Sequence, residues 1–323
     1  MAAWAVAAAF VATLLGCGLF LRLARRVGLF DVPNTRSAHR QPTPRGGGVG
    51  ILAGMLAALA VLTLWEYPVP PPYPGLLVIA LALLLAGLLD DRAELPVMLR
   101  LPLYAILCLA AVWLLRAGLP LWLGLLAALY ALWILNLFNF MDGIDGIAAS
   151  EAGFVFAAAA GLSLSLGVDG FYPLLCLLLA AGCLAFLHWN WAPARLFMGD
   201  AGSIPLGFLL AMLSLQGEVS GELPLSCWLI LLAVFITDST YTLFWRALHG
   251  EKVTEAHSRH SYQRLARHWD SHGRVVVVMS LYNLFWLLPL AFLAAHRPGL
   301  TWPCLLLAYL PLLPLRRKAD KLP

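Results

Sequence analysis

The stretch LPLWLGLLAALYALWIL, residues 119–135, carries no charged side chain and decides the class of fold. A helix that crosses about 30 Å of hydrocarbon needs about 20 mostly apolar residues, and this stretch comes close to that length. Residues 76–89, 171–187 and 224–236 are also uncharged. Soluble domains have roughly 25% charged residues, whereas this chain has 12%. The sequence therefore predicts transmembrane helices rather than a soluble core.

Apolar runs of this kind are spread along the whole chain. Read as transmembrane helices, they number about eleven, with approximate bounds 1–21, 49–65, 75–89, 97–116, 119–137, 147–167, 171–188, 203–217, 223–244, 274–295 and 300–315. We find no linker, repeat or soluble domain between them. We therefore predict an all-α, polytopic membrane protein in which residues 1–323 form a single integral-membrane domain.

The basic residues are concentrated on one side of these spans. With the amino terminus outside, all but two of the 21 Lys and Arg residues belong to one face, the exceptions being Arg116 and Arg297. The positive-inside rule makes that face cytoplasmic. The amino terminus is then periplasmic and the carboxyl terminus cytoplasmic. Because basic residues follow the first span and none precedes it, we expect an uncleaved helix rather than a secretory signal.

The first polar cluster is the acid pair Asp90-Asp91, at the inner end of the third predicted span. Adjacent carboxylates repel each other, and placing them near a medium of low dielectric constant is costly. A divalent cation, a nearby arginine or a proton would offset that cost. A solvated acidic turn is the alternative interpretation.

The second polar cluster is NLFNFMDGIDGIA, residues 136–148, where an apolar helix reaches the cytoplasmic surface. Asn136 and Asn139 offer amide groups, and Asp142 and Asp145 can share one face of a helical turn. Carboxylates suit Mg²⁺ or a nucleotide, and the glycines let a ligand approach the backbone. One Asp-Gly turn means little, but two of them after two asparagines indicate a binding site.

The third polar cluster is FMGDAGS, residues 197–203, at the start of the eighth predicted span. Gly199 and Gly202 flank Asp200 at a helix start, where free N–H groups favour anions. Asp200 and Ser203 could instead cap the helix. Because capping alone does not need a glycine on each side, the pattern favours a functional role.

The fourth polar cluster is the loop 246–274, which contains His257, Arg259 and His260. Arginine forks bind phosphate oxygens, and histidine exchanges protons near neutral pH. In isolation, such a basic loop often serves only topology or lipid headgroups. Arg45, in the glycine-rich stretch 42–48, is a further candidate for binding phosphate.

Asp238 is a separate candidate, because acids inside a membrane span are rare and usually functional. We assign ordinary interfacial positions to the remaining histidines, His39, His188, His249, His268, His272 and His296. The four clusters all fall on the predicted cytoplasmic side. They combine acids for a metal, glycines for close approach and cations for phosphate, which is what phosphoryl transfer requires.

In this order, the motifs resemble those of the polyprenyl-phosphate N-acetylhexosamine-1-phosphate transferases. The resemblance extends from Pro42 to Gln263, with Asp90-Asp91 as the paired acids, NxxNxxDGxDGxA at 136–148 and FxGDxGS at 197–203. The peptidoglycan branch of the family has a lysine where this chain has Glu94, and a different histidine motif. The string AHSRHSYQRL, residues 256–265, looks more like the branch that initiates O-antigen or related surface glycans.

The resemblance also implies roles for individual residues. Those that it marks as catalytic are Asp90, Asp91, Asp200, His257 and His260. Those that would hold Mg²⁺, with Mn²⁺ as an alternative ion, are Asp200, Asp91 and Asp145. Those that would bind the substrates are Asn136, Asn139, Asp142, Asp145, Arg45, Arg259, Gly199 and Ser203.

The reaction implied is transfer of an N-acetylhexosamine-1-phosphate from a UDP-sugar to undecaprenyl phosphate, with release of UMP, at the cytoplasmic face of a bacterial inner membrane. The partners would be these two substrates and membrane lipid, without nucleic acid, and both a monomer and a homodimer agree with the sequence. A phospho-N-acetylmuramoyl-pentapeptide transferase is one alternative. A transporter or flippase for lipid-linked sugars is another, although its site would lie near the bilayer midplane. A non-catalytic scaffold is the third.

Overall fold

The structure, a computed structural model, describes residues 1–33, 41–93, 95–115, 120–252 and 258–322. Within these ranges, nine helical segments are long and apolar enough to cross a membrane. They are α1 (Ala2–Val27), α3 (Tyr73–Ala93), α4 (Val97–Leu115), α5 (Leu121–Phe140), α6 (Ile147–Ser165), α7 (Phe171–Asn190), α8 (Asp200–Ser220), the segment His272–His296 and the segment Pro298–Ala319.

The last two segments are built from shorter helices. The first contains α12 (His272–Tyr282), the π-helix η1 (Asn283–Leu287) and α13 (Leu288–His296), and the second contains the 3₁₀-helix η2 (Pro298–Leu300), α14 (Thr301–Tyr309) and α15 (Leu312–Ala319). The other described helices are α2 (Gly48–Leu64), α9 (Leu225–Leu231), α10 (Ala233–Leu248) and α11 (Ser261–Trp269).

The predicted spans therefore coincide with apolar helices, so the prediction of a mostly helical, polytopic membrane protein is confirmed. The number eleven and the orientation of the termini stay predictions. The span predicted at 223–244 is not one straight helix, because α9 and α10 meet at an angle of 73°. Neither proline nor glycine occurs at the break, so the bend was not predictable from the residues there.

Helix α8 lies at the centre of the bundle. In the most apolar part of α8, 83% of the residues are buried, whereas in that of α4 only 22% are. Glycines let neighbouring helices approach it closely: a Cβ atom on Gly87 of α3 would collide with the carbonyl of Asp200, and one on Gly48 of α2 with that of Ala201. Such contacts between small residues are typical of helices packed in a membrane. They bring the ends of α2 and α3 against the start of α8.

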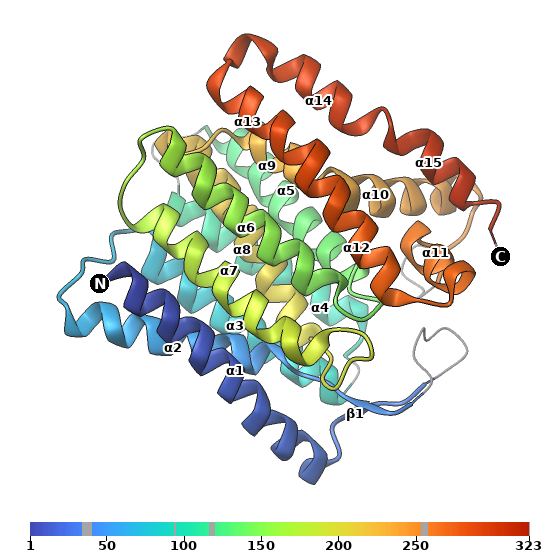
Figure 1. The fold of residues 1–323 in the computed structure, drawn as a ribbon, viewed down its shortest axis with the longest axis horizontal. Helices are drawn as coiled ribbons and strands as arrows, with labels where there is room; N and C mark the ends of the chain where they lie inside the picture. The colour runs from blue at the N-terminus through green and yellow to red at the C-terminus, as the bar shows by residue number, and fades with distance from the viewer. Residues whose placement is uncertain (34–40, 94, 116–119, 253–257, 323) are drawn as a thin grey trace.

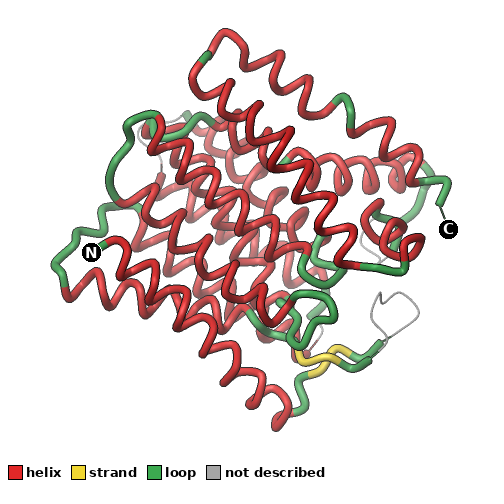
Figure 2. Tube along the Cα trace, in the orientation of Figure 1, coloured by secondary structure: helices red, strands yellow, loops and turns green. Residues whose placement is uncertain are grey.

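A short hairpin lies at the end of the bundle where α8 begins. Strand β1 (Phe30–Asp31) pairs antiparallel with β2 (Thr43–Pro44). From Pro44 of β2 to Gly47, the backbone exchanges hydrogen bonds with Phe197, whose N–H donates to Pro44 at 2.8 Å and whose carbonyl accepts from Gly47 at 2.9 Å. Figures 1 and 2 show the hairpin and α11 at the end of the bundle away from the amino terminus. The hairpin thus places Arg45 beside the start of α8.

Candidate functional site

The acid pair and the FMGDAGS motif are in direct contact. Asp91 Oδ1 accepts from the backbone N–H of Asp200 at 3.0 Å, and Asp91 Oδ2 accepts from Ala201 at 3.1 Å. Asp91, which is buried at the end of α3, therefore caps the N-terminus of α8. Gly199 makes this possible, since its φ is +68° and a Cβ atom there would collide with the Asp91 carboxylate. The helix cap is therefore Asp91 rather than Asp200 itself. The Asp200 side chain is left to face other groups.

Two arginines compensate part of this negative charge. Arg100 donates through Nη1 to Asp90 and also to Asp200 Oδ2 at 3.1 Å. Arg45 donates to the backbone carbonyl of Asp91, and its Nε lies 3.9 Å from Asp91 Oδ1. A nearby arginine was one of three expected ways to offset the acid pair, and both arginines serve it. Arg100 was not among the predicted site residues, although a lone cation in the first turn of an apolar helix was an available signal.

The two asparagines of residues 136–148 have different surroundings. Asn139 Oδ1 accepts from the hydroxyl of Ser203 at 2.7 Å, which links α5 to the first turn of α8. Asn136, by contrast, donates to the carbonyl of Leu132, one turn back in its own helix, at 2.7 Å. Asn139 and Ser203 therefore lie at the meeting point of the second and third clusters, whereas the Asn136 amide is engaged within α5.

Asp145 is held by groups from two other parts of the chain. Its Oδ2 accepts from the N–H of Ala194 at 3.1 Å and lies 3.3 Å from Nδ1 of His272. The next N–H along the chain, on Gly146, donates to Asn190 Oδ1 at 3.0 Å. Neither Asn190 nor His272 was among the predicted site residues, because their partners are far away in the sequence. These contacts fix the shape of the loop between α5 and α6.

Asp142 differs from its neighbours because, within the described residues, its carboxylate makes no hydrogen bond or ion pair. Burial raises the pKa of the Asp142 carboxyl well above its ordinary value, and the nearby carboxylates of Asp91 and Asp145 raise it further. The acids of all three clusters are therefore close enough to interact. Among these acids, Asp142 is the one whose carboxylate has no partner in the described part of the chain.

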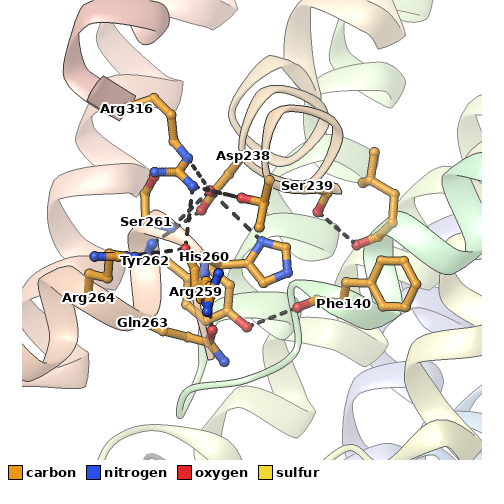
Figure 3. Close-up of polar contacts among 12 residues, drawn as sticks. Phe140, Asp238, Ser239, Arg259, His260, Ser261, Tyr262, Gln263, Arg264 and Arg316 are labelled. Atoms are coloured by element: carbon orange, nitrogen blue, oxygen red, sulfur yellow. Dashed lines mark hydrogen bonds and ion pairs between the residues drawn. The ribbon is translucent and has the colours of Figure 1, made fainter. Parts of the chain in front are cut away.

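The fourth cluster is anchored by Asp238 (Figure 3). Asp238 accepts from the N–H of Ser261 at 2.9 Å and from that of Tyr262 at 3.2 Å, so it caps α11 as Asp91 caps α8. Its Oδ1 also lies 3.1 Å from Nε of Arg316, on α15. Asp238 therefore caps α11 and pairs with Arg316, while its functional role stays a prediction.

The His260 side chain is buried beside Asp238 and Tyr262 and is not exposed at the second cluster. The residue is 2% exposed, its Nδ1 is 3.9 Å from Asp238 Oδ1, and its ring stacks on that of Tyr262 (Figure 3). The hydroxyl of Tyr262 donates to the carbonyl of Phe140 at 2.9 Å. Phe140 is three residues before Gly143 of the second cluster. Arg259 is exposed and pairs with Glu251. His257 lies outside the described residues.

The fit of this site to a metal ion follows from its charges and ligand atoms. No three His, Cys, Asp or Glu side chains in the described part of the chain already surround one point as metal ligands. Asp91 and Asp200 are in contact, while Asp145 is engaged by Ala194 and His272. The carboxylates nevertheless outnumber the two arginines, and Asp142 has no cationic partner. Excess carboxylate oxygens of this kind suit Mg²⁺ or Mn²⁺.

Comparison with known proteins adds an independent line of evidence. Residues 73–218, which include three of the four clusters, match the model of glycosyl transferase family 4. The chain is 31% identical to the decaprenyl-phosphate N-acetylglucosaminephosphotransferase of Mycobacterium leprae, over 85% of this chain and 79% of that protein. It is 26% identical to a probable undecaprenyl-phosphate N-acetylglucosaminyl 1-phosphate transferase of Bacillus subtilis, over 80% and 76%.

A second group of transferases is similar over a shorter part of the chain. The phospho-N-acetylmuramoyl-pentapeptide-transferase of Moorella thermoacetica is 33% identical, but over only 60% of this chain and 67% of that protein. The longer matches are thus to transferases named for N-acetylglucosamine. Together with the converging motifs, they show that this chain belongs to glycosyl transferase family 4, the polyprenyl-phosphate N-acetylhexosamine-1-phosphate transferases.

Proposed function

We propose that the protein transfers an N-acetylhexosamine-1-phosphate from a UDP-sugar to undecaprenyl phosphate on the cytoplasmic face of the membrane, and that this step initiates O-antigen or a related surface glycan. An oxygen of the lipid phosphate attacks the β-phosphorus of the UDP-sugar. The bond from that phosphorus to the bridging oxygen breaks, and UMP leaves with the α-phosphate. Because a phosphate oxygen is already ionised near neutral pH, the step needs no strong general base.

The observation that carries this proposal is the contact of Asp91 with the start of α8, which gathers the acids of three separate connections beside Arg45 and Arg100. Phosphoryl transfer is accelerated mainly by positioning and by neutralising charge. Arg45 is suited to the lipid phosphate, and Asn139 and Ser203 to the nucleotide. Asp90 is salt-bridged to Arg100, so we assign it a positioning role.

We further propose that Asp200, Asp91 and Asp142 hold a magnesium ion, with Asp145 shaping the loop from behind. Mg²⁺, or Mn²⁺ in its place, would neutralise phosphate charge when bound. Asp142 joins the expected set because it has no partner among the described residues. Asp145 leaves it because the N–H of Ala194 already donates to its Oδ2, and because its own backbone N–H is tied to His272.

The test uses purified protein with undecaprenyl phosphate, Mg²⁺ and a panel of UDP-sugars that includes UDP-N-acetylglucosamine and UDP-N-acetylmuramoyl-pentapeptide. We expect UMP release with a UDP-N-acetylhexosamine, and mass spectrometry should find one sugar and two phosphates on the lipid. Turnover confined to the pentapeptide substrate would move the protein to the peptidoglycan branch. Uptake into proteoliposomes without UMP release would identify a transporter instead.

The proposal that Asp200 is a metal ligand can be tested separately. Replacing Asp200 with Asn keeps the size of the side chain but removes its charge, so we expect at least about a 100-fold loss of turnover. Mg²⁺ titration of the residual activity should shift to higher concentration. Full activity of the Asp200→Asn variant would reject Asp200 as a metal ligand.

A further inference from the structure

Glu151 is a buried acid that lies outside the four polar clusters. It is in the second turn of α6, five residues after Gly146, and is 1% exposed. It is the one charged residue between positions 146 and 168, and the segment 275–295, which packs against α6, has none. No lysine, arginine or histidine among the described residues pairs with it. Because an acid is costly to bury inside a membrane span, its presence there indicates a function.

The partner of Glu151 is the amide of Asn283. Nδ2 of Asn283 donates to Glu151 Oε2 at 2.5 Å, and Asn283 is itself 1% exposed. Asn283 directly follows α12 and is the first residue of the π-helix η1, inside the span His272–His296. Helices α6 and α12 lie side by side (Figure 1). The bond therefore joins two membrane helices inside the bundle, where hydrogen bonds between side chains hold helices together.

The two remaining oxygens of this pair indicate that Glu151 carries a proton. Glu151 Oε1 and Asn283 Oδ1 are both buried, and neither has a hydrogen-bond partner among the described residues. An ionised carboxylate and an amide oxygen are both acceptors, so they cannot bond to each other. A proton on Oε1 makes it a donor, and one hydrogen bond to Oδ1 then satisfies both atoms. The neutral acid also avoids the large cost of burying a charge without a cation.

Helix α12 is tied at both of its ends to one short stretch of chain. At its first residue, Nδ1 of His272 accepts from the N–H of Asp145 at 3.3 Å. Just beyond its last residue, Asn283 bonds to Glu151, which is six residues after Asp145. A helix held at both ends has little freedom to slide or turn. The buried pair therefore fixes where the imidazole of His272 stands beside the loop that carries Asp142.

We propose that Glu151 is a neutral carboxylic acid which, through two hydrogen bonds to Asn283, positions α12 and His272 for binding of the UDP-sugar. Glu151 is a positioning residue rather than a catalytic one, because it is buried within α6 and acts through His272. The inference rests on the proposed function, since the loop that Glu151 supports is part of the proposed nucleotide site.

Infrared spectroscopy tests the proton without requiring turnover. The full-length protein in proteoliposomes is compared with its Glu151→Gln variant, in H2O and in D2O. We expect the unmodified protein to show a carbonyl band of a protonated carboxylic acid that shifts in D2O and that the variant lacks. If the variant instead loses a band of an ionised carboxylate, Glu151 is charged and the proposal is overturned.

Two substitutions of Glu151 test its role in binding. Glutamine has an NH2 group where the neutral acid has its hydroxyl, so it keeps both bonds to Asn283, and kcat and KM should stay within about twofold of the unmodified protein. Leucine is similar in size but makes neither bond. We expect Glu151→Leu to raise KM for the UDP-sugar about fivefold, the equivalent of one net hydrogen bond, and KM for undecaprenyl phosphate less than about twofold. A glutamine variant as impaired as the leucine variant, or an equal rise of both KM values, would overturn the proposal.

A double-variant cycle separates positioning from a general loss of stability. In a His272→Ala background, Glu151→Leu should raise KM for the UDP-sugar less than about twofold, because both changes remove the same support. The same fivefold rise in both backgrounds would contradict a role through His272. The matched control is Ser163→Ala, since the buried Ser163 hydroxyl donates to Ala159 of its own helix. Its KM values should equal those of the unmodified protein.

The infrared arm also keeps this inference separate from the proposed function. If the unmodified protein transfers no sugar phosphate, the proposed function fails. The acid band then still decides whether Glu151 carries a proton, and its absence overturns the inference. If Glu151→Leu does not fold, the infrared band and the kinetics of Glu151→Gln decide in the same way.

Discussion

At the residue scale, the most informative side chain is that of Asp142. Its neighbours are each engaged: Asp91 with the start of α8, Asp200 with Arg100, and Asp145 with Ala194 and His272. Asp142 has no partner in the described part of the chain, and it lies among like charges that raise its pKa. Such a group lowers the stability of the protein without its ligands, which is typical of a site built for binding.

Replacing Asp142 with Asn should therefore raise stability and abolish activity. The folded carboxyl ionises at a higher pH than the unfolded one, so its ionisation removes stability as the pH rises through the folded pKa. The amide avoids this cost, and we expect a higher Tm at pH 7.5 in metal-free detergent solution, with at least about a 100-fold loss of turnover. A lower Tm would show that the carboxylate has a structural partner.

The cap of α8 by Asp91 depends on the glycine at position 199. Alanine at this position meets both a φ of +68° and the Asp91 carboxylate, so we expect a loss of about 1–3 kcal/mol and of most activity. Gly161, an exposed glycine inside α6 with open space around its Cα, is the matched control. Alanine there should be neutral or stabilise by about 0.5–1 kcal/mol. Comparable Tm values for the two variants would contradict this account of the cap.

At the element scale, α11 and α12 are placed by contacts at their N-termini. Asp238 and His260 hold the start of α11, and Tyr262 ties it to Phe140, next to the second cluster. His272 is the first residue of α12 and contacts Asp145. Two short helices that are remote from α8 in sequence thus support the loop that carries Asp142.

The stability of α11 should fall in mild acid. Burial lowers the pKa of His260, although Asp238 opposes the shift. As the pH falls below about 6.5, the unfolded imidazole takes up a proton before the folded one, so stability is lost by at most about 1.4 kcal/mol per pH unit. Thermal unfolding at pH 7.5 and 5.5 should show this loss. The His260→Gln variant should show a smaller difference, and an unchanged difference would assign the effect to other groups.

His272 should affect binding more than the overall fold. The N–H of Asp145 donates to Nδ1 of His272 at 3.3 Å, and losing such a bond costs about 1 kcal/mol. We expect His272→Ala to raise KM for the UDP-sugar several-fold with little change in Tm, and His272→Gln, which keeps an acceptor, to recover most of the loss. Failure of His272→Gln to recover any of it would indicate that the imidazole itself is required.

At the scale of the whole molecule, composition made the spans predictable, because a membrane requires long uncharged helices. The meeting of the three acid-bearing clusters was predictable from their predicted common side. The contacts inside the site were not: Arg100 and Asp200 are a hundred residues apart, and His272 and Asp145 are 127 apart. The capping of α11 by Asp238 was not predictable either, because Ser261 and Tyr262 are 23 and 24 residues further along the chain.

The predicted orientation can be measured by cysteine labelling, because all six native cysteines are buried. A membrane-impermeant maleimide added to intact cells should label Arg297→Cys, which follows α13. It should label Arg26→Cys, at the end of α1, only after the inner membrane is opened. Labelling of Arg26→Cys in intact cells, without labelling of Arg297→Cys, would invert the topology and place the candidate site outside.

The capping of α8 by Asp91 also sets an order for biosynthesis. The ribosome delivers the amino-terminal part first, so α3 enters the membrane before the N–H groups of Asp200 and Ala201 exist. Until α8 arrives, the Asp91 carboxylate lacks these two backbone partners, and the candidate site is incomplete. A nascent chain released before that point would expose a buried acid at the bilayer surface, a mark by which membrane proteases could distinguish it from finished protein.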